Sequence, residues 1–89
     1  MQIRPGRYRH YKGPLYRVLA SARHSETEEW LVIYQALYGE YGLWARPATM
    51  FAGTVMVEGV ERPRFEFLHE EPGFDVSSPP QETVTTESR

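Results

Sequence analysis

Four consecutive polar residues, His24, Ser25, Glu26 and Thr27, form the densest cluster of groups that could do chemistry in this 89-residue chain. A histidine beside a serine and a glutamate has the composition of a hydrolase site, but adjacent residues rarely align as nucleophile, base and orienting group. The chain also lacks the G-x-S-x-G turn that presents a serine nucleophile. The favoured interpretation is a turn closed by hydrogen bonds from side chains to the backbone. An accessory enzyme, with His24 as acid-base and Glu26 orienting it, stays open as an alternative.

The segment 7–12 interleaves basic and aromatic residues and is the second candidate for chemistry. As a strand it places Arg7, Arg9 and Tyr11 on one face and Tyr8, His10 and Lys12 on the other. Basic side chains that contact phosphates, next to a ring that stacks on a base, are suited to single-stranded nucleic acid or to a nucleotide. Arg7, Arg9 and Lys12 are therefore the candidate basic face. The favoured interpretation of the segment is nevertheless structural: the tyrosines pack in the core while the arginines keep an edge strand soluble.

A third candidate lies where Trp44 and Arg46, two residues apart on a predicted strand, share a face and can form a cation–π pair. We expect the ends of several strands to meet the turn at Arg46-Pro47 and to build one concave site there. Such a site would bind an anionic or planar ligand, for example a nucleotide or an RNA segment. The candidate ligand-binding residues are His24, Glu26, Thr27, Tyr34, Trp44 and Arg46.

Metal and cofactor chemistry have little support in the sequence. The chain has no cysteine, which excludes disulfides, thiolate zinc ligands and thiol nucleophiles. Its three histidines, His10, His24 and His69, do not have the spacing of metal ligands, and no glycine-rich phosphate loop is present. We therefore expect no metal and no cofactor, and a small binding module rather than an enzyme.

The small net charge of −2 conceals a strong polarity along the chain. Residues 1–23 contain six basic residues and no acid, whereas residues 47–89 contain eight acids and three arginines. An anionic partner for the N-terminal half, such as a nucleotide or RNA, is consistent with this polarity. A protein partner that pairs with exposed strand edges is the rival hypothesis. No apolar run is long enough to span a membrane, so a cytoplasmic protein without membrane contact is expected.

The elements that must position these residues are short strands separated by glycine and proline. Strands are predicted at 8–11, 15–22, 30–38, 43–45, 54–58 and 64–68, the last two as a pair, with one helical turn near 47–51. The strand at 15–22 alternates regularly, and Met50 and Phe51 are predicted to point inward. The fold class is therefore all-β or mainly β: a small, strongly bent, SH3-like antiparallel barrel of five to six short strands. A helix over 26–37, begun by a capping box at Ser25–Glu28, is the alternative.

Hydrophobic residues divide the chain into two parts. Residues 1–71 carry nearly all of them and are expected to form a single small domain. Residues 72–89 are rich in proline, serine, threonine and glutamate. Because such a segment cannot bury enough apolar area to offset the entropy of ordering it, we expect a disordered C-terminal tail.

Several short motifs follow one another in a distinctive order. They are G-x-Y-x-H-Y-K-G at 6–13, H-S-E-T at 24–27, W-x-R-P-x-x-M-F at 44–51 and R-F at 64–65. This order resembles the bacterial family known as domain of unknown function 1653, and the resemblance spans residues 6–68. It implies a short, stand-alone cytoplasmic protein, and it implies no particular activity.

Overall fold

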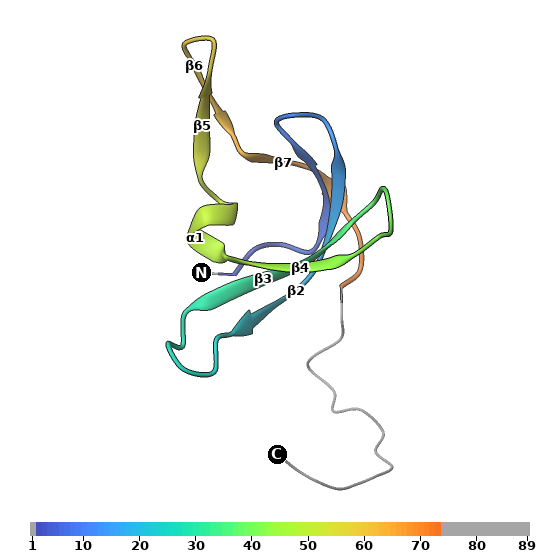
Figure 1. Ribbon diagram of the computed structural model, residues 1–89, viewed down its shortest axis with the longest axis vertical. Coiled ribbons are helices and arrows are strands. Elements are labelled where there is room, and N and C mark those ends of the chain that lie inside the picture. The colour runs from blue at the N-terminus through green and yellow to red at the C-terminus, as the bar shows by residue number, and fades with distance from the viewer. Residues whose placement is uncertain (1, 74–89) are drawn as a thin grey trace, which may run out of the picture.

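The structure, a computed structural model, describes residues 2–73, which form short strands and one helical turn (Figure 1). The elements are β1 (Gly6–His10), β2 (Leu15–Arg23), β3 (Trp30–Ala36), β4 (Leu43–Pro47), α1 (Ala48–Phe51), β5 (Thr54–Val57), β6 (Val60–Pro63) and β7 (Phe65–Glu70). The mainly β prediction is confirmed, and the helix considered for 26–37 is wrong, because this region contains β3. Within the described part of the chain, no helix has the length and apolar character needed to cross a membrane.

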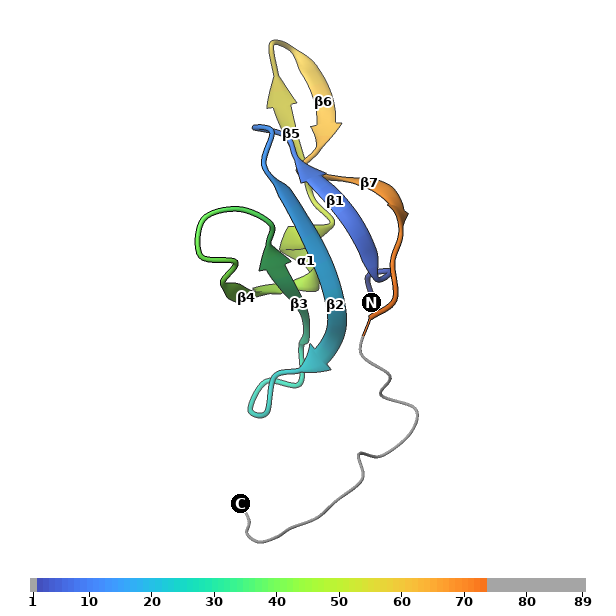
Figure 2. The same cartoon turned by 90° about the vertical axis from the view of Figure 1, so that its right-hand side faces the viewer.

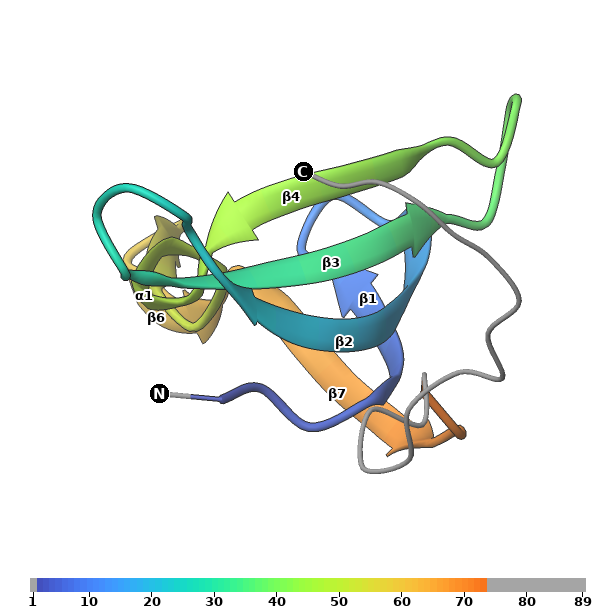
Figure 3. The same ribbon diagram turned by 90° about the horizontal axis from the view of Figure 1, so that it is seen from below.

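Five of the strands form one antiparallel sheet in the order β4-β3-β2-β1-β7. Figure 3 shows the sheet curling strongly from β4 to β7. Within residues 2–73 these two edge strands do not pair with each other, so the sheet is bent but the predicted barrel is not closed. The bend gives the sheet an inner face, which α1 partly covers, and an outer face.

A bulge in β2 changes which side chains face the core. Val18 lies opposite Tyr34 and Ser21 lies opposite Val32, because one extra residue, Leu19, interrupts the register. Directly opposite residues of an antiparallel pair share a face, and both β3 partners are buried in the core. The regular alternation predicted for this strand is therefore wrong beyond the bulge.

The inner face holds a small aromatic core. Phe51 of α1 stacks on Phe65 of β7, with ring centroids 4.1 Å apart and planes 3° apart. The same ring meets Tyr8 and Tyr34 edge-on, each at 5.3 Å between centroids. Phe51 thus points inward as predicted, but Met50 of the same turn is 53% exposed, so that half of the prediction is wrong. The other buried members of the cluster are Val18, Val32 and Ala48.

β5 and β6 pair with each other and project from the sheet as a hairpin (Figure 2). Val57 lies opposite Val60 across a two-residue loop, in which Glu58 and Gly59 both have positive φ, at 52° and 81°. Such loops match the right-handed twist of hairpin strands. The predicted pairing of 54–58 with 64–68 is wrong, since β7 pairs with β1 instead.

The chain continues past β7 along the outer face of the sheet. Arg17 of β2 donates a hydrogen bond from Nη2 to the Pro72 carbonyl at 2.6 Å. Gly73 packs so closely on the Leu19 carbonyl that there is no room there for a Cβ atom. Residues 74–89, which are most of the predicted tail, lie outside the described residues.

Candidate functional site

One part of the inner face of the sheet is not covered by α1, and this part carries aromatic and basic side chains. Trp44 lies opposite Tyr34 and so shares the inner face, yet it is 59% exposed. Arg46 lies opposite the buried Val32 and points to the same side. We call this open region the aromatic-basic patch, and its residues are His10, Lys12, Tyr16, Tyr34, Tyr38, Trp44, Arg46 and Arg64.

Tyr16 connects the aromatic members of the patch. Its ring meets those of Tyr34 and Tyr38 edge-on, at 5.4 Å and 5.6 Å between centroids. The hydroxyls of Tyr16 and Tyr38 are 2.6 Å apart and share a hydrogen bond. Burial, followed by this bond, raises the pKa of Tyr16 to about 12. The Tyr16 hydroxyl is therefore neutral at pH 7 and can donate its proton to Tyr38 or to a ligand.

Arg46 places its guanidinium group across the patch. Its Nε donates to the Tyr34 hydroxyl at 3.2 Å, and its Cζ lies 5.6 Å from the centroid of the Phe65 ring. The cation–π partner is thus Phe65 and not the predicted Trp44. Among residues 2–73, no carboxylate forms an ion pair with Arg46, Lys12 or Arg64. The positive charge of the patch is therefore available to an external anion.

His10 lies at the edge of the patch, beside these cations. Its ring is 5.0 Å from Phe65 and 6.3 Å from Tyr16 between centroids. Burial first, and then the charges of Arg64, Lys12 and Arg46, lower the pKa of His10 below its ordinary value. His10 Nδ1 accepts the Lys12 backbone N–H at 3.1 Å, so the proton of the neutral ring is on Nε2. At pH 7 the patch therefore carries its charge on arginine and lysine alone.

The lowered pKa of His10 predicts an acid-sensitive domain. Below the ordinary pKa of 6.5, the unfolded chain binds a proton that the folded chain does not yet bind. The free energy of unfolding therefore decreases as the pH is lowered. We expect urea denaturation to show a smaller loss of stability between pH 7.5 and pH 5 for His10→Gln than for the wild type. An unchanged loss in His10→Gln would contradict the prediction.

The structure gives His24, Glu26 and Thr27 a local role in the turn between β2 and β3. His24 Nδ1 accepts the backbone N–H groups of Glu26 at 3.1 Å and of Thr27 at 3.3 Å. Thr27 Oγ1 accepts the Glu29 N–H at 3.2 Å and donates to the Glu29 carboxylate at 3.1 Å. Within residues 2–73 no hydrogen bond or ion pair joins this turn to the aromatic-basic patch. A ligand-binding role for the three residues stays a prediction.

The candidate basic face is divided between the two sides of the sheet. Lys12 lies beside His10 in the patch. Arg9 is exposed on β1, where it lines, together with His10 of the patch, a groove of about 420 Å³ between β1 and the β5–β6 hairpin. Arg7 is paired on the outer face with Glu71, whose carboxylate oxygen Oε2 lies 3.1 Å from Arg7 Nη2. Of the predicted site residues, the structure thus brings together Tyr34, Trp44 and Arg46, whereas Lys12 Nζ lies 5.8 Å from the centroid of the Tyr11 ring.

Four members of the patch were not among the predicted site residues: His10, Tyr16, Tyr38 and Arg64. A signal for the first two existed, because the alternation of β1 places His10 on the side opposite Arg9, and the turn to β2 brings Tyr16 beside it. Tyr38 and Arg64 lie just outside the strands, where hydrophobic periodicity carries no information. Only the folded chain shows that they belong here.

Comparison with known proteins agrees with the motifs. The family model described as "Protein of unknown function (DUF1653)" matches residues 6–67. A crystal structure of a DUF1653 protein from Bordetella bronchiseptica is similar, with a TM-score of 0.70 and 36% sequence identity, over 81% of this chain and 95% of that chain. No curated protein matches the chain. The chain therefore belongs to the DUF1653 family of proteins of unknown function.

Proposed function

We propose that this protein is a small binding module whose aromatic-basic patch takes a ligand that is both planar and anionic, a nucleotide or a short single-stranded RNA. The observation that carries the proposal is the meeting of exposed rings and unpaired cations on one open face. Trp44 and Tyr38 are 59% and 48% exposed. Arg46 shares the face of Trp44, and Arg64 lies close enough to His10 for its charge to lower the pKa of that residue; neither arginine has a carboxylate partner in residues 2–73.

The two kinds of side chain match the two parts of a nucleotide. Aromatic rings stack on bases of any type, and arginine and lysine contact the phosphates. Exposure of a large indole costs free energy that a small domain does not recover internally, whereas a stacked base would cover it. The Tyr34 hydroxyl holds the Arg46 guanidinium in place, which reduces the entropy lost when an anion binds.

The proposal is tested with a fluorescein-labelled oligouridylate of eight nucleotides, using fluorescence anisotropy at several salt concentrations. Three cations in contact with phosphates predict that log K falls against log salt with a slope of about −2. Trp44→Ala should weaken binding by about 5-fold to 150-fold, the loss of one stacked base. Arg46→Ala should weaken binding and reduce the slope by about 0.7.

Arg9→Ala is the matched control, because it removes the same charge from the outer side of β1 and should leave the affinity close to that of the wild type. If Arg9→Ala weakens binding as strongly as Arg46→Ala, the ligand lies on the outer face and the proposal is wrong. Binding that ignores salt and tolerates both Arg46→Ala and Trp44→Ala would also overturn it, and would favour a protein partner. Thermal unfolding of each variant confirms that the fold is intact.

A further inference from the structure

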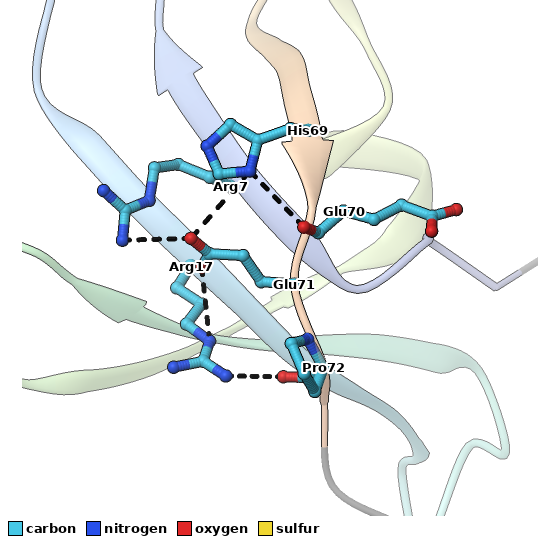
Figure 4. Close-up of polar contacts among 6 residues, drawn as sticks. All are labelled: Arg7, Arg17, His69, Glu70, Glu71 and Pro72. Atoms are coloured by element: carbon cyan, nitrogen blue, oxygen red, sulfur yellow. Dashed lines mark hydrogen bonds and ion pairs between the residues drawn. The ribbon is translucent and has the colours of Figure 1, made fainter.

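A second cluster of arginines lies on the outer face, away from the aromatic-basic patch. Arg7 of β1 and Arg17 of β2 are directly opposite each other in the register. Like charges in this arrangement repel, so the pair needs an anion close by. Figure 4 shows the Glu71 carboxylate between the two guanidinium groups, 3.1 Å from Arg7 Nη2 and 3.4 Å from Arg17 Nε. His69 Nδ1 lies 3.9 Å from the same carboxylate.

The carboxylate fills this site incompletely. Two guanidinium groups offer ten N–H donors, whereas one carboxylate accepts at about four positions and the Pro72 carbonyl accepts one bond from Arg17. Arg7 Nε, Arg17 Nε and Glu71 Oε1 are all shielded from solvent and form no hydrogen bond within the described residues, although Arg17 Nε and Glu71 Oε1 face each other in the ion pair at 3.4 Å. Two positive charges also face only one negative charge. A group with more oxygens and a charge of −2 would satisfy the two arginines better.

We propose that Arg7, Arg17 and His69 form a phosphate-binding site, and that Glu71 occupies it as a tethered competitor when no phosphate is bound. The ligand is a phosphate dianion, either the free ion or the terminal group of a phosphate monoester. Both present the oxygens and the charge that the arginine pair lacks. This site does not rest on the function proposed for the aromatic-basic patch, since it lies on the other face of the sheet.

The segment that carries Glu71 is built so that it can leave. Glu71 follows the last residue of β7, so its backbone takes no part in the strand pairing. The segment 71–73 is held on the outer face by three features: the carboxylate itself, the Arg17 bond to the Pro72 carbonyl at 2.6 Å and the packing of Gly73 on the Leu19 carbonyl. A phosphate that binds the two arginines displaces the Glu71 carboxylate directly and competes with the Pro72 carbonyl for Arg17.

The test is an NMR titration of the full chain with inorganic phosphate, and separately with methyl phosphate, at pH 7.4 and constant ionic strength set by chloride. The arginine Nε–H signals of Arg7 and Arg17 report binding. Glu71→Gln removes the competing charge and should lower the phosphate Kd by about tenfold, because the fraction of open sites rises. Glu70→Gln is the matched control, since it removes the same charge next door, from a pair with Arg4 at 3.6 Å whose side chains are mostly exposed.

The expected result is tighter binding in Glu71→Gln than in both the wild type and Glu70→Gln, with loss of the arginine shifts in Arg17→Ala. A preference for either phosphate probe identifies the source of the ligand and supports the site. Equal affinity in all three proteins, or shifts confined to the aromatic-basic patch, would overturn the proposal. Should Glu71→Gln not fold, the wild type decides: saturating phosphate must lower the heteronuclear NOE of Gly73, and an unchanged value rejects the competitor. Arg46→Ala should leave this titration unchanged, whatever becomes of nucleotide binding.

Discussion

Phe51→Ala is expected to remove a large part of the protein's free energy of unfolding, about 3–5 kcal/mol. The Phe51 ring is 2% exposed and stacks on Phe65 at 4.1 Å, while Tyr8 and Tyr34 meet its edges. Removal of a buried phenylalanine side chain costs about 3–5 kcal/mol. A domain of this size has a total stability of only about 4–11 kcal/mol, so the loss is a large part of the whole. Urea denaturation followed by tryptophan fluorescence measures it.

Met50→Ala is the matched control for this prediction. It lies on the same helical turn but is 53% exposed, so its loss should stay below about 1 kcal/mol. Phe65→Leu, which removes the stacking partner but leaves most of the apolar volume, should fall between the two. If Phe51→Ala loses no more stability than Met50→Ala, then α1 does not close the core.

Gly6→Ala is the second substitution with a large expected effect, because it disturbs the contact between the paired strands β1 and β7. A Cβ atom on Gly6 would lie 2.5 Å from the His69 carbonyl oxygen and 2.9 Å from the Phe67 ring, and the φ angle of Gly6 is +155°. The carbonyl is part of the backbone of β7 and cannot rotate away. Overpacking costs about 1–3 kcal/mol and backbone strain a similar amount. We expect a corresponding fall in unfolding free energy and faster amide exchange along β7.

Gly59→Ala separates strain from steric collision. Gly59 also has a positive φ, +81°, but no atom lies within 4 Å of the position of its Cβ. Its cost should therefore be the strain alone, about 1–2 kcal/mol. Exchange in β7 should stay at the wild-type rate in this variant. Equal losses in the two glycine variants would show that the close approach of β1 and β7 contributes nothing.

The places where sequence reasoning failed share one physical cause. The residue types around Leu19 are those of a regular strand, so the sequence pattern of β2 does not mark the residue where the alternation shifts. The Glu58-Gly59 loop is a weak turn signal compared with Asn-Gly, so the sequence predicts one strand and a loop where the structure has the β5–β6 hairpin. The predicted pairing of 54–58 with 64–68 then followed, although β7 belongs beside β1. That choice depends on which faces can be buried together, and not on local propensity.

The candidate site was predictable to the extent that it depends on residues close in sequence. Trp44 and Arg46 share a face because side chains of a strand repeat every two residues, and this required no partner strand. Tyr38 and Arg64 come from loops far apart in the chain, and the folded sheet places Tyr38 against Tyr16 of β2 and Arg64 near His10 of β1. His24 shows the opposite case: its turn bonds are local, and they match the turn interpretation without any tertiary contact.

The densest cluster of reactive side chains, at His24–Thr27, therefore lies in a local turn and is not joined to the aromatic-basic patch by a hydrogen bond within the described residues. The sequence by itself determined the mainly β character, the strand at 30–36, the helical turn after Pro47 and the family, because these depend on residue type, short spacing and motif order. The tertiary structure alone decided which cations are free. Arg7 and Arg17 face Glu71 in the outer cluster, while Arg46 and Arg64 have no such partner within residues 2–73. All four are arginines at similar local sites, and only the path of the folded chain determines which of them a carboxylate can reach.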